Sequence, residues 1–432
     1  MSASAAASRR VFQNGERPPE TLTHRKSVAI GDLHGDFYRL TRLLEEEDIL
    51  IPSTFAWNPR ACNVDLILIG DYVDWRGEPL EGSADRASDG ARRILELLHS
   101  LDRQVRELRE QYADFDGRIY VLRGNHDDMM LDALKVLDFM STSQLESMMR
   151  NHHHYLMKFR GAMVSMGLGG EQLETMMKFL NWFVQGGRTT LEGWESLEAW
   201  KRDMDGELGT WLRHDLLLGA VVNNRLYAHT APDLAEFWRP LHELRELPAI
   251  DQSRMRESFL WSRKLWGFDY YTGSRSEPFS EAELDRMLSG IGVEGVVVGH
   301  TPVTTETEPF LAYNGKVINI DLHGIPGSRA LVETYEIDPA SVRGVDGSDG
   351  PPRIVLDTVT LAPRPEPPPK PMRKRASRKV GQSASSAEAT ASETAPTNAE
   401  TPQNEEKTPS ETTAPDAPDK EVTATATTAA DA

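Results

Sequence analysis

Residues 31–36 read Gly-Asp-Leu-His-Gly-Asp and follow directly on the apolar run Val-Ala-Ile at residues 28–30. A carboxylate and an imidazole therefore come where a buried strand should end. If the alternation of the strand continues past its last residue, Asp32 and His34 project to the same side. The stretch indicates a fold built on buried strands, with polar chemistry at a strand exit.

Four later blocks repeat this arrangement in order along the chain. Each places carboxylate, amide or imidazole side chains after an apolar run: Gly-Asp-Tyr-Val-Asp at 70–74, Arg-Gly-Asn-His-Asp at 123–127, Tyr-Ala-His-Thr at 227–230 and Val-Gly-His-Thr-Pro at 298–302. One block alone would be weak evidence, because short motifs occur by chance in loops and turns. Five blocks in order, each closing a strand-like run, indicate one shared site.

Short apolar runs alternate with helical patterns between residue 26 and about residue 360. Short, mainly apolar runs, as in strands covered on both faces, predict strands at residues 28–30, 64–69, 119–122, 295–298 and 317–320. Apolar residues at steps of three and four predict helices at residues 37–49 and 89–112. This alternation is typical of α/β layers, in which ligands gather where strands end.

Residues 128–215 depart from that rhythm, because this segment has a helical pattern and is rich in Met and Trp. Its methionine pairs, such as Met148-Met149 and Met176-Met177, are most simply explained as filler of a helical core. The alternative is a helical cap whose adaptable surface selects the substrate. We favour the cap, because so long an insert between two site-bearing strands must pass close to the site.

The donor atoms of the five blocks are oxygens and nitrogens, which suit hard divalent or trivalent metal ions. Two-metal hydrolases hold their ions roughly 3.5 to 4 Å apart, so at least one ligand must be shared. Asp71, in the middle of the set, is our candidate for the bridging carboxylate. We predict that Asp32 and His34 complete the ligand set of one ion. The ligand set of the other ion is completed by Asn125, His229 and His300.

A hydroxide bridging two such ions can attack phosphorus directly, because metal binding lowers the pKa of water toward neutrality. The leaving group then needs a proton, and we predict that His126 donates it. Asp74 would accept a hydrogen bond from His126 and favour its protonated form. Guanidinium groups suit phosphate oxygens, and the candidates are Arg76, Arg123 and Arg263.

The composition restricts the protein's class. Its net charge of −19 argues against a nucleic-acid binder or an anionic-membrane binder. The single cysteine, Cys62, cannot form an internal disulfide and fits a reducing compartment. No apolar window is long enough to cross a bilayer. We therefore expect a cytoplasmic protein, with a nuclear location as the alternative.

The two ends of the chain differ in composition from the region between them. We predict a disordered arm at residues 1–25, one folded domain at 26–361 and a disordered tail at 362–432 that is rich in Pro, Ala, Thr and Glu. Six basic residues lie within 370–379. This segment resembles a nuclear-import signal or a patch for an acidic partner; the alternative is a solvated linker.

The blocks together resemble the phosphoprotein phosphatases, whose signatures are GDxHG, GDxVDRG and GNHE followed by two separated histidines, within the wider calcineurin-like metallophosphoesterases. The first block, the Gly-His-Thr-Pro block and Leu-Trp-Ser-Arg at 260–263 are most similar to the Shewanella-like branch. The resemblance implies a central β-sandwich of two mixed sheets flanked by helices. It also implies manganese, iron or zinc as cofactors, the metal-ligand roles given above and the His126–Asp74 acid dyad. Arg76 and Arg263 would bind the phosphate.

Three positions depart from the family pattern. Trp75 is inserted between Asp74 and Arg76, which shifts the arginine by one position. Asp127 replaces the usual Glu, and Thr230-Ala231 replaces two glycines after His229. None of the three removes a predicted metal ligand. Asp321 and His323 follow a further strand, and we interpret them as structural.

These features predict hydrolysis of phosphomonoesters, on phosphoproteins in particular. The nearest rival is hydrolysis of a dinucleoside polyphosphate or a phosphodiester at the same site. A rival of another class is a phosphatase-like regulatory scaffold, which the insertion of Trp75 favours and the intact ligand set opposes.

Overall fold

The computed structural model describes residues 24–82, 87–112, 115–153, 167–244, 247–269, 274–336 and 355–357. The predicted N-terminal arm lies outside this part except for its last two residues, and the predicted tail with its basic segment 370–379 lies outside it entirely. Both remain predictions. Within the described residues, no helix combines the length and the hydropathy that crossing a bilayer requires.

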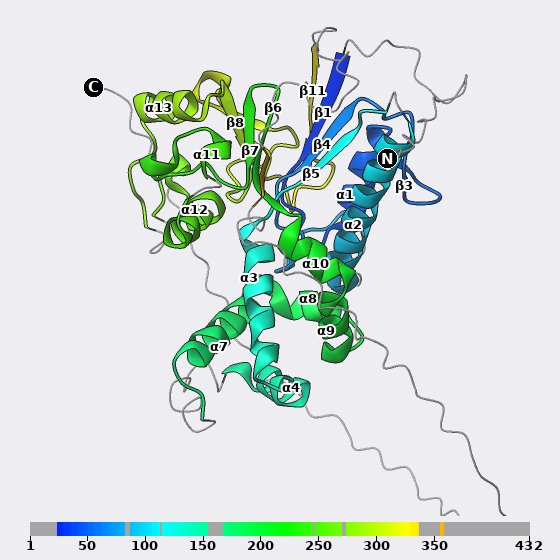
Figure 1. Cartoon of the computed structure of the whole chain (residues 1–432), viewed down its shortest axis with the longest axis vertical. Helices are drawn as coiled ribbons and strands as arrows, with labels where there is room; N and C mark the ends of the chain where they lie inside the picture. Colours follow the sequence, from blue (N-terminus) through cyan, green and yellow to red (C-terminus); the bar gives the residue numbers. More distant parts are fainter. Residues whose placement is uncertain are drawn as a thin grey trace, which may run out of the picture. The chain divides into compact units, whose positions relative to one another are not determined.

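Two mixed β-sheets form the centre of the fold (Figure 1). In the first, β4 pairs in parallel with β1 and β5, and β1 pairs antiparallel with β11. The strands of this sheet, in spatial order, are β11 (Leu331–Glu336), β1 (His24–Ile30), β4 (Val64–Leu68) and β5 (Arg118–Val121). The three parallel strands end at the same edge of the sheet.

The second sheet has a parallel centre and antiparallel flanks. Strand β8 pairs in parallel with β7 and β10, and the outer pairs are antiparallel. Its spatial order is β12 (Val355–Asp357), β6 (Leu217–Val222), β7 (Arg225–Ala228), β8 (Gly295–Val298), β10 (Val317–Asn319) and β9 (Phe310–Ala312). A short hairpin of β2 (Leu50–Ile51) and β3 (Ala56–Trp57) stands apart from both sheets.

The two sheets pack face to face. Ile67 and Ile69 belong to a core cluster shared by the two sheets, whereas Leu66 and Leu68 belong to the core on the helical side. This division follows from the strand period of two, because successive side chains point to opposite faces. Both faces of β4 are buried, which explains why its sequence is apolar except at Asp65, whose buried carboxylate pairs with Arg25 at 2.7 Å. The predicted α/β sandwich of two mixed sheets is confirmed.

Helices cover the outer face of each sheet. The first sheet is covered by α1 (Phe37–Glu46) and α2 (Ala87–Gln111), and the second by α11 (Leu241–Leu244), α12 (Ala249–Trp261) and α13 (Glu281–Ile291). The boundaries have local causes. The Asp36 side chain caps α1 by accepting from the backbone N–H of Arg39, and Ser280 and Glu283 form a capping box on α13.

The insert between β5 and β6 is helical, as its pattern predicts. Its described elements are α3 (Asn125–Leu134), η2 (Lys135–Asp138), α4 (Thr142–Arg150), α7 (Glu171–Trp182), the π-helical turn η3 (Phe183–Gly187), α8 (Arg188–Glu192), α9 (Leu197–Asp205) and α10 (Glu207–His214). Met148 and Met176 are buried in the core, while Met177 is 48% exposed. Core filling is therefore confirmed for one member of each of these pairs, and α8 and α10 rest on α2.

Candidate active site

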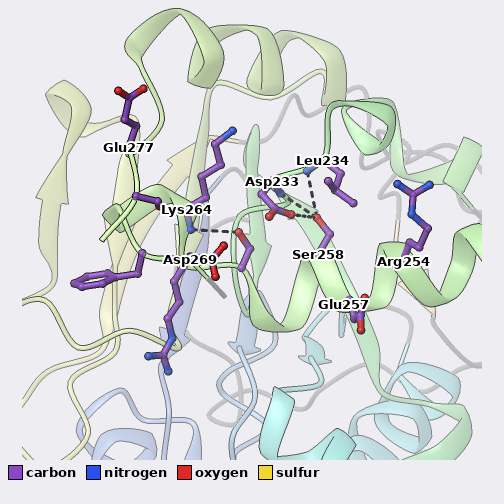
Figure 2. Close-up of a pocket in the computed structure, with 12 residues that line it drawn as sticks. Asp233, Leu234, Arg254, Glu257, Ser258, Lys264, Asp269 and Glu277 are labelled. Carbon is purple, nitrogen blue, oxygen red and sulfur yellow. Dashed lines mark hydrogen bonds between the residues drawn. The ribbon is translucent and has the colours of Figure 1, made fainter. Parts of the chain in front are cut away.

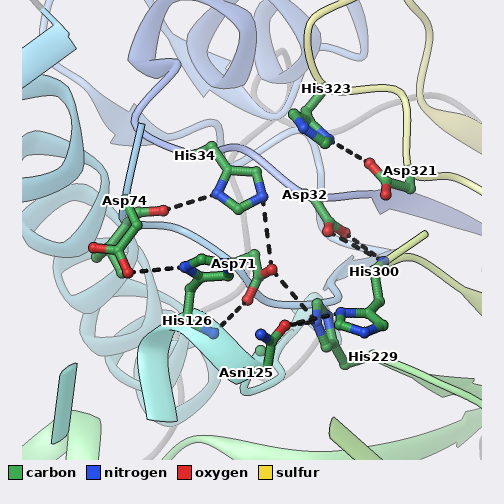
Figure 3. A network of polar contacts seen from close by, with 12 residues as sticks. Asp32, His34, Asp71, Asp74, Asn125, His126, His229, His300, Asp321 and His323 are labelled. Carbon is green, nitrogen blue, oxygen red and sulfur yellow. Dashed lines mark hydrogen bonds and ion pairs between the residues drawn. The ribbon is translucent and has the colours of Figure 1, made fainter. Parts of the chain in front are cut away.

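The strand exits bring the predicted donors together (Figure 3). Asp32 and His34 follow β1, Asp71 follows β4, and Asn125 follows β5. The second sheet contributes His229 after β7 and His300 after β8. These strands run in parallel within each sheet, so their carboxyl ends lie along one edge of each sheet. The five sequence blocks therefore form a single buried cluster.

The backbone at these exits is strained. His34, Asp71, Asp74 and His300 all have positive φ values, of 43°, 54°, 70° and 65°. Non-glycine residues rarely adopt this region, and each such residue costs about 1–3 kcal/mol. Such strain is characteristic of functional sites, and here all four residues belong to the sequence blocks that form the site.

Asp71 lies at the centre of the cluster. Its Oδ2 is 3.6 Å from His34 Nε2 and 3.5 Å from His229 Nε2, and its Oδ1 accepts from the backbone N–H of His126 at 2.9 Å. One carboxylate thus faces imidazoles from both sheets. This is the position that a ligand shared by two ions requires.

On one side of Asp71, three side chains converge. Asn125 Oδ1 is 2.9 Å from His229 Nε2 and 2.9 Å from His300 Nδ1. The other nitrogen of His229 donates to the Ile69 carbonyl at 2.9 Å, which fixes the ring so that Nε2 points into the cluster. Ligand atoms of Asp71, His229 and His300 lie within 4.8 Å of one another, a spacing that suits a metal ion.

On the other side, Asp32 and His34 face the same carboxylate. His34 Nδ1 donates to the Val73 carbonyl at 3.0 Å, so its Nε2 is directed toward Asp71. Both oxygens of Asp32 accept from the backbone N–H of His300, at 3.2 and 3.1 Å. The first and second sheets are therefore joined at this point by a carboxylate and a main-chain donor.

The electrostatics of the cluster show that it suits cations. Burial and the neighbouring carboxylates Asp321 and Asp71 raise the pKa of Asp32 to about 8. Burial opposes protonation of His229, but Asp71 and Asp32 outweigh it and raise the pKa of this imidazole to about 10. A proton on His229 thus supplies positive charge that the crowded carboxylates require. The oxygen and imidazole donors fit hard divalent or trivalent ions in the same place.

His126 and Asp74 form the predicted pair beside this cluster. His126 Nδ1 donates to Asp74 Oδ2 at 2.9 Å, and both side chains are buried. Burial opposes protonation of His126, but Asp71 and Asp74 outweigh it and raise its pKa. In contrast, burial and the neighbouring cations lower the pKa of His34 and of His300 well below its usual value. These pKa shifts favour the protonated form of His126 and His229 and the neutral form of His34 and His300.

Two residues of the insert hold Asp74, and no motif in the sequence points to either. Trp182 Nε1 lies 3.0 and 2.8 Å from the two Asp74 oxygens, and Thr190 Oγ1 donates to Asp74 Oδ1 at 2.6 Å. The backbone N–H of Asp74 donates back to Thr190 Oγ1 at 2.9 Å. Trp182 is 108 positions from Asp74 and Thr190 is 116 positions away. The insert thus reaches the predicted acid pair directly.

The three candidate arginines have different surroundings. Arg263 Nε donates to His300 Nε2 at 3.1 Å, and burial and the charge of Arg76 lower the pKa of Arg263. Arg76 is exposed and pairs with Glu78 at 3.3 Å, and its charge also acts on His34. Arg263 thus contacts the cluster directly, and the charge of Arg76 acts on His34 and Arg263 despite the insertion of Trp75.

Arg123 is not directed at the cluster. Its guanidinium donates to the carbonyls of Leu212 and Arg213, at 2.8 and 3.2 Å, and pairs with Asp128 at 3.4 Å. It therefore joins the end of β5 to the end of α10. The geometry does not support the prediction that Arg123 binds phosphate, because its two terminal nitrogens contact main-chain carbonyls and a carboxylate of the insert, and its Nε is buried.

The other departures from the family pattern have structural counterparts. Asp127 accepts from the backbone N–H groups of Asp71, Tyr72 and Gly124, at 2.9, 3.0 and 2.9 Å. The shorter carboxylate therefore positions the turn that carries Asp71. Thr230, which replaces the first glycine after His229, donates from Oγ1 to the Ser258 carbonyl at 3.0 Å.

A cavity of about 440 Å³ opens beside Arg263 (Figure 2). Its lining is mostly charged or polar and includes Arg254, Glu257, Lys264 and Asp269 together with the aromatic ring of Phe268. Ser258 Oγ donates to Asp233 at 2.6 Å within this wall. The cavity offers room for a polar group next to the cluster.

Residues 26–304 match the family described as calcineurin-like phosphoesterase, which is more than half of the chain. Among solved structures, the chain is similar to a cold-active protein-tyrosine phosphatase of a psychrophile Shewanella sp., with a TM-score of 0.39 and 21% identity over 72% of this chain and 75% of that one. It is also similar to a protein serine/threonine phosphatase from Saccharomyces cerevisiae, with a TM-score of 0.36 and 14% identity over 79% and 85% of the two chains. No curated protein matches the sequence significantly.

Proposed function

Because the chain belongs to the calcineurin-like phosphoesterase family, we propose that it is a two-metal phosphatase that hydrolyses phosphomonoesters of phosphoproteins. The observation that carries the proposal is the position of Asp71, whose Oδ2 lies 3.5 and 3.6 Å from imidazoles of the two sheets. A shared carboxylate between two sets of donors is what a dinuclear hydrolase needs.

The chain's own residues divide into three roles. Asp32 and His34 would hold one ion, Asp71 would bridge, and the second ion would be held by Asn125, His229 and His300. Two bound ions of manganese, iron or zinc would lower the pKa of water and polarise the phosphoryl oxygens, which is the chemistry of direct hydrolysis.

His126 would protonate the leaving oxygen. Its Nδ1 is held by Asp74, which leaves Nε2 for the substrate, and its raised pKa keeps a proton available. Arg263 and Arg76 would bind the phosphoryl oxygens, because both lie at the edge of the cluster and guanidinium groups donate in pairs to such oxygens. The cavity beside Arg263 would take residues that flank the phosphorylated side chain.

The experiment is a substrate panel on the full-length protein. We expect turnover of an aryl phosphate and of phosphopeptides, and loss of this turnover with a chelator and in Asp71→Asn. The matched control is Asp205→Asn on α9, whose side chain is 63% exposed and pairs with Lys201 of the same helix. That variant should keep the wild-type rate.

Two results would contradict the proposal. Turnover of dinucleoside polyphosphates or phosphodiesters alone would assign the site to those substrates. Two bound ions without turnover of any substrate would instead support a regulatory scaffold. Import or partner binding through residues 370–379, and a cytoplasmic or nuclear location, remain proposals that a deletion of this segment would test by imaging.

A further inference from the structure

A second pair of side chains, Asp321 and His323, lies beside the cluster (Figure 3). One ligand atom from each of Asp32, His34 and His323 lies within 4.8 Å of the others. The His34 and His323 rings are 4.5 Å apart between centroids. Three donors from the two sheets therefore converge on one point, on the side of His34 away from Asn125.

The close approach of two strand exits produces this arrangement. Gly31 directly follows β1, and a Cβ atom at this position would lie 1.8 Å from the carbonyl oxygen of Ile320, just after β10. No side chain larger than hydrogen fits there. The absence of a Cβ brings Asp32 beside the segment that carries Asp321 and His323.

His323 is held in the manner of a metal-binding imidazole. Its Nδ1 donates to Asp321 Oδ1 at 2.5 Å, as His34 and His229 donate to carbonyl oxygens. Metal-binding histidines almost always donate their other ring N–H to a carboxylate or carbonyl. This leaves His323 Nε2 available as a metal ligand. The carboxylate of Glu78 is 4.0 Å from Nε2, which is beyond hydrogen-bond distance.

An independent observation concerns Asp321. This residue is completely buried, and its Oδ2 has no hydrogen-bond partner among the residues that the structure describes. A buried carboxylate oxygen without a partner is unfavourable, because its hydration has been lost without replacement. A cation at the convergence point of Asp32, His34 and His323 would compensate its charge.

We propose that His323 is a further protein ligand of the ion held by Asp32 and His34, and that Asp321 positions its ring. The inference rests on the proposed function, since it concerns one of the two ions. Without His323, that ion would have Asp32, His34 and the shared Asp71. With His323 it has four protein ligands, as many as the ion held by Asp71, Asn125, His229 and His300.

The test measures metal binding and not turnover. Chelator-treated wild type, His323→Ala, His323→Gln, Asp321→Asn and the control His242→Ala are titrated with Mn²⁺ by calorimetry, and bound metal is counted by elemental analysis. His242 is an exposed histidine on α11. Electron paramagnetic resonance then distinguishes paired from single Mn²⁺ ions.

We expect two ions in wild type and in His242→Ala. In both His323 variants one ion should bind at least about tenfold more weakly. In Asp321→Asn the affinity for the same ion should fall roughly 10–100-fold, the usual effect of losing a partner of a metal-binding histidine. The spectrum of the paired ions should be lost at Mn²⁺ concentrations that still fill the other position. Circular dichroism of the metal-free proteins establishes that each variant is folded, and His323→Gln preserves side-chain length if His323→Ala does not fold.

Unchanged affinity for both ions in the folded His323 variants would overturn the inference and leave the proposed function intact. A wild-type protein that binds no Mn²⁺, Fe²⁺ or Zn²⁺ would contradict the proposed function itself. The two failures are therefore distinguishable in one set of titrations.

Discussion

Replacing Thr190 by valine tests whether the helical insert positions the acid pair. The Thr190 hydroxyl makes two contacts with Asp74: it donates to the carboxylate at 2.6 Å and accepts from the backbone N–H at 2.9 Å. Valine has nearly the same shape but makes neither contact. Thr190→Ser keeps the hydroxyl and is the matched control.

The magnitude follows from what the substitution leaves unpaired. Asp74 is completely buried, so water cannot replace the lost donor. A hydrogen bond to a charged group contributes about 1.5–3 kcal/mol and an unpaired buried N–H costs about 1–3 kcal/mol, so Thr190→Val should lower the free energy of unfolding by roughly 2–4 kcal/mol. Trp182 Nε1 still donates to both carboxylate oxygens, which limits the loss.

The effect on catalysis has a defined direction. Burial raises the pKa of Asp74, and the hydrogen bonds from His126 and Thr190 oppose that rise by favouring the ionised form. Without the hydroxyl the pKa of Asp74 should rise further, so the acidic limb of the kcat profile should move to higher pH. If the poorer positioning of His126 raises the activation free energy by about 1.4–2.7 kcal/mol, kcat falls 10–100-fold.

The assay is turnover of an aryl phosphate between pH 5 and 9, with denaturant unfolding on the same samples. We expect kcat to fall, KM to stay unchanged and Thr190→Ser to behave as wild type. A Thr190→Val protein that unfolds more easily but keeps the wild-type kcat and pH profile would refute a positioning role. It would show that the insert contributes only stability at this point.

Three further predictions test other parts of the site. Chelation should lower the melting temperature and added Mn²⁺ should restore it, because Asp32, Asp71 and Asp321 are buried together. At a Mn²⁺ concentration 100 times the Kd, binding should add about 2.7 kcal/mol to the free energy of unfolding. A calorimetric scan in which Mn²⁺ stabilises Asp71→Asn as much as wild type would contradict this prediction. Arg263→Ala should raise the KM for an aryl phosphate roughly 10–100-fold through loss of a charge-assisted contact, whereas Arg123→Ala should reduce stability with little change in KM; steady-state kinetics and urea unfolding separate the two. Asp132→Asn should cost about 1 kcal/mol at pH 7, because Arg256, Lys135 and Lys178 outweigh burial and hold the pKa of Asp132 below its usual value. That contribution is present above the unfolded-state pKa of Asp and is lost as the pH falls through the lower folded-state pKa. The difference in the free energy of unfolding between Asp132→Asn and wild type, measured with urea, should therefore shrink toward pH 3. The exposed control Asp205→Asn should differ little from wild type in this free energy.

Much of the site could be predicted because its donors lie at strand exits. A run that is apolar on both faces marks a strand in a covered sheet, and polar residues directly after it lie at the edge where ligands bind. This reasoning applies to Asp32, Asp71 and His300, each of which the structure brings into the cluster. The helical pattern of the insert was equally readable, since its period is local.

Local sequence patterns are enough to locate the strand ends and the donor atoms that follow them. The side chains that approach those donors from distant segments become visible in the folded chain: Trp182 and Thr190 at Asp74, and His323 at His34. It also decided that Arg123, one residue before the third block's glycine, turns to the carbonyls of α10. The physical reason is that strand and helix periods are set by neighbours along the chain. A contact across more than a hundred residues depends on the path of every element between them.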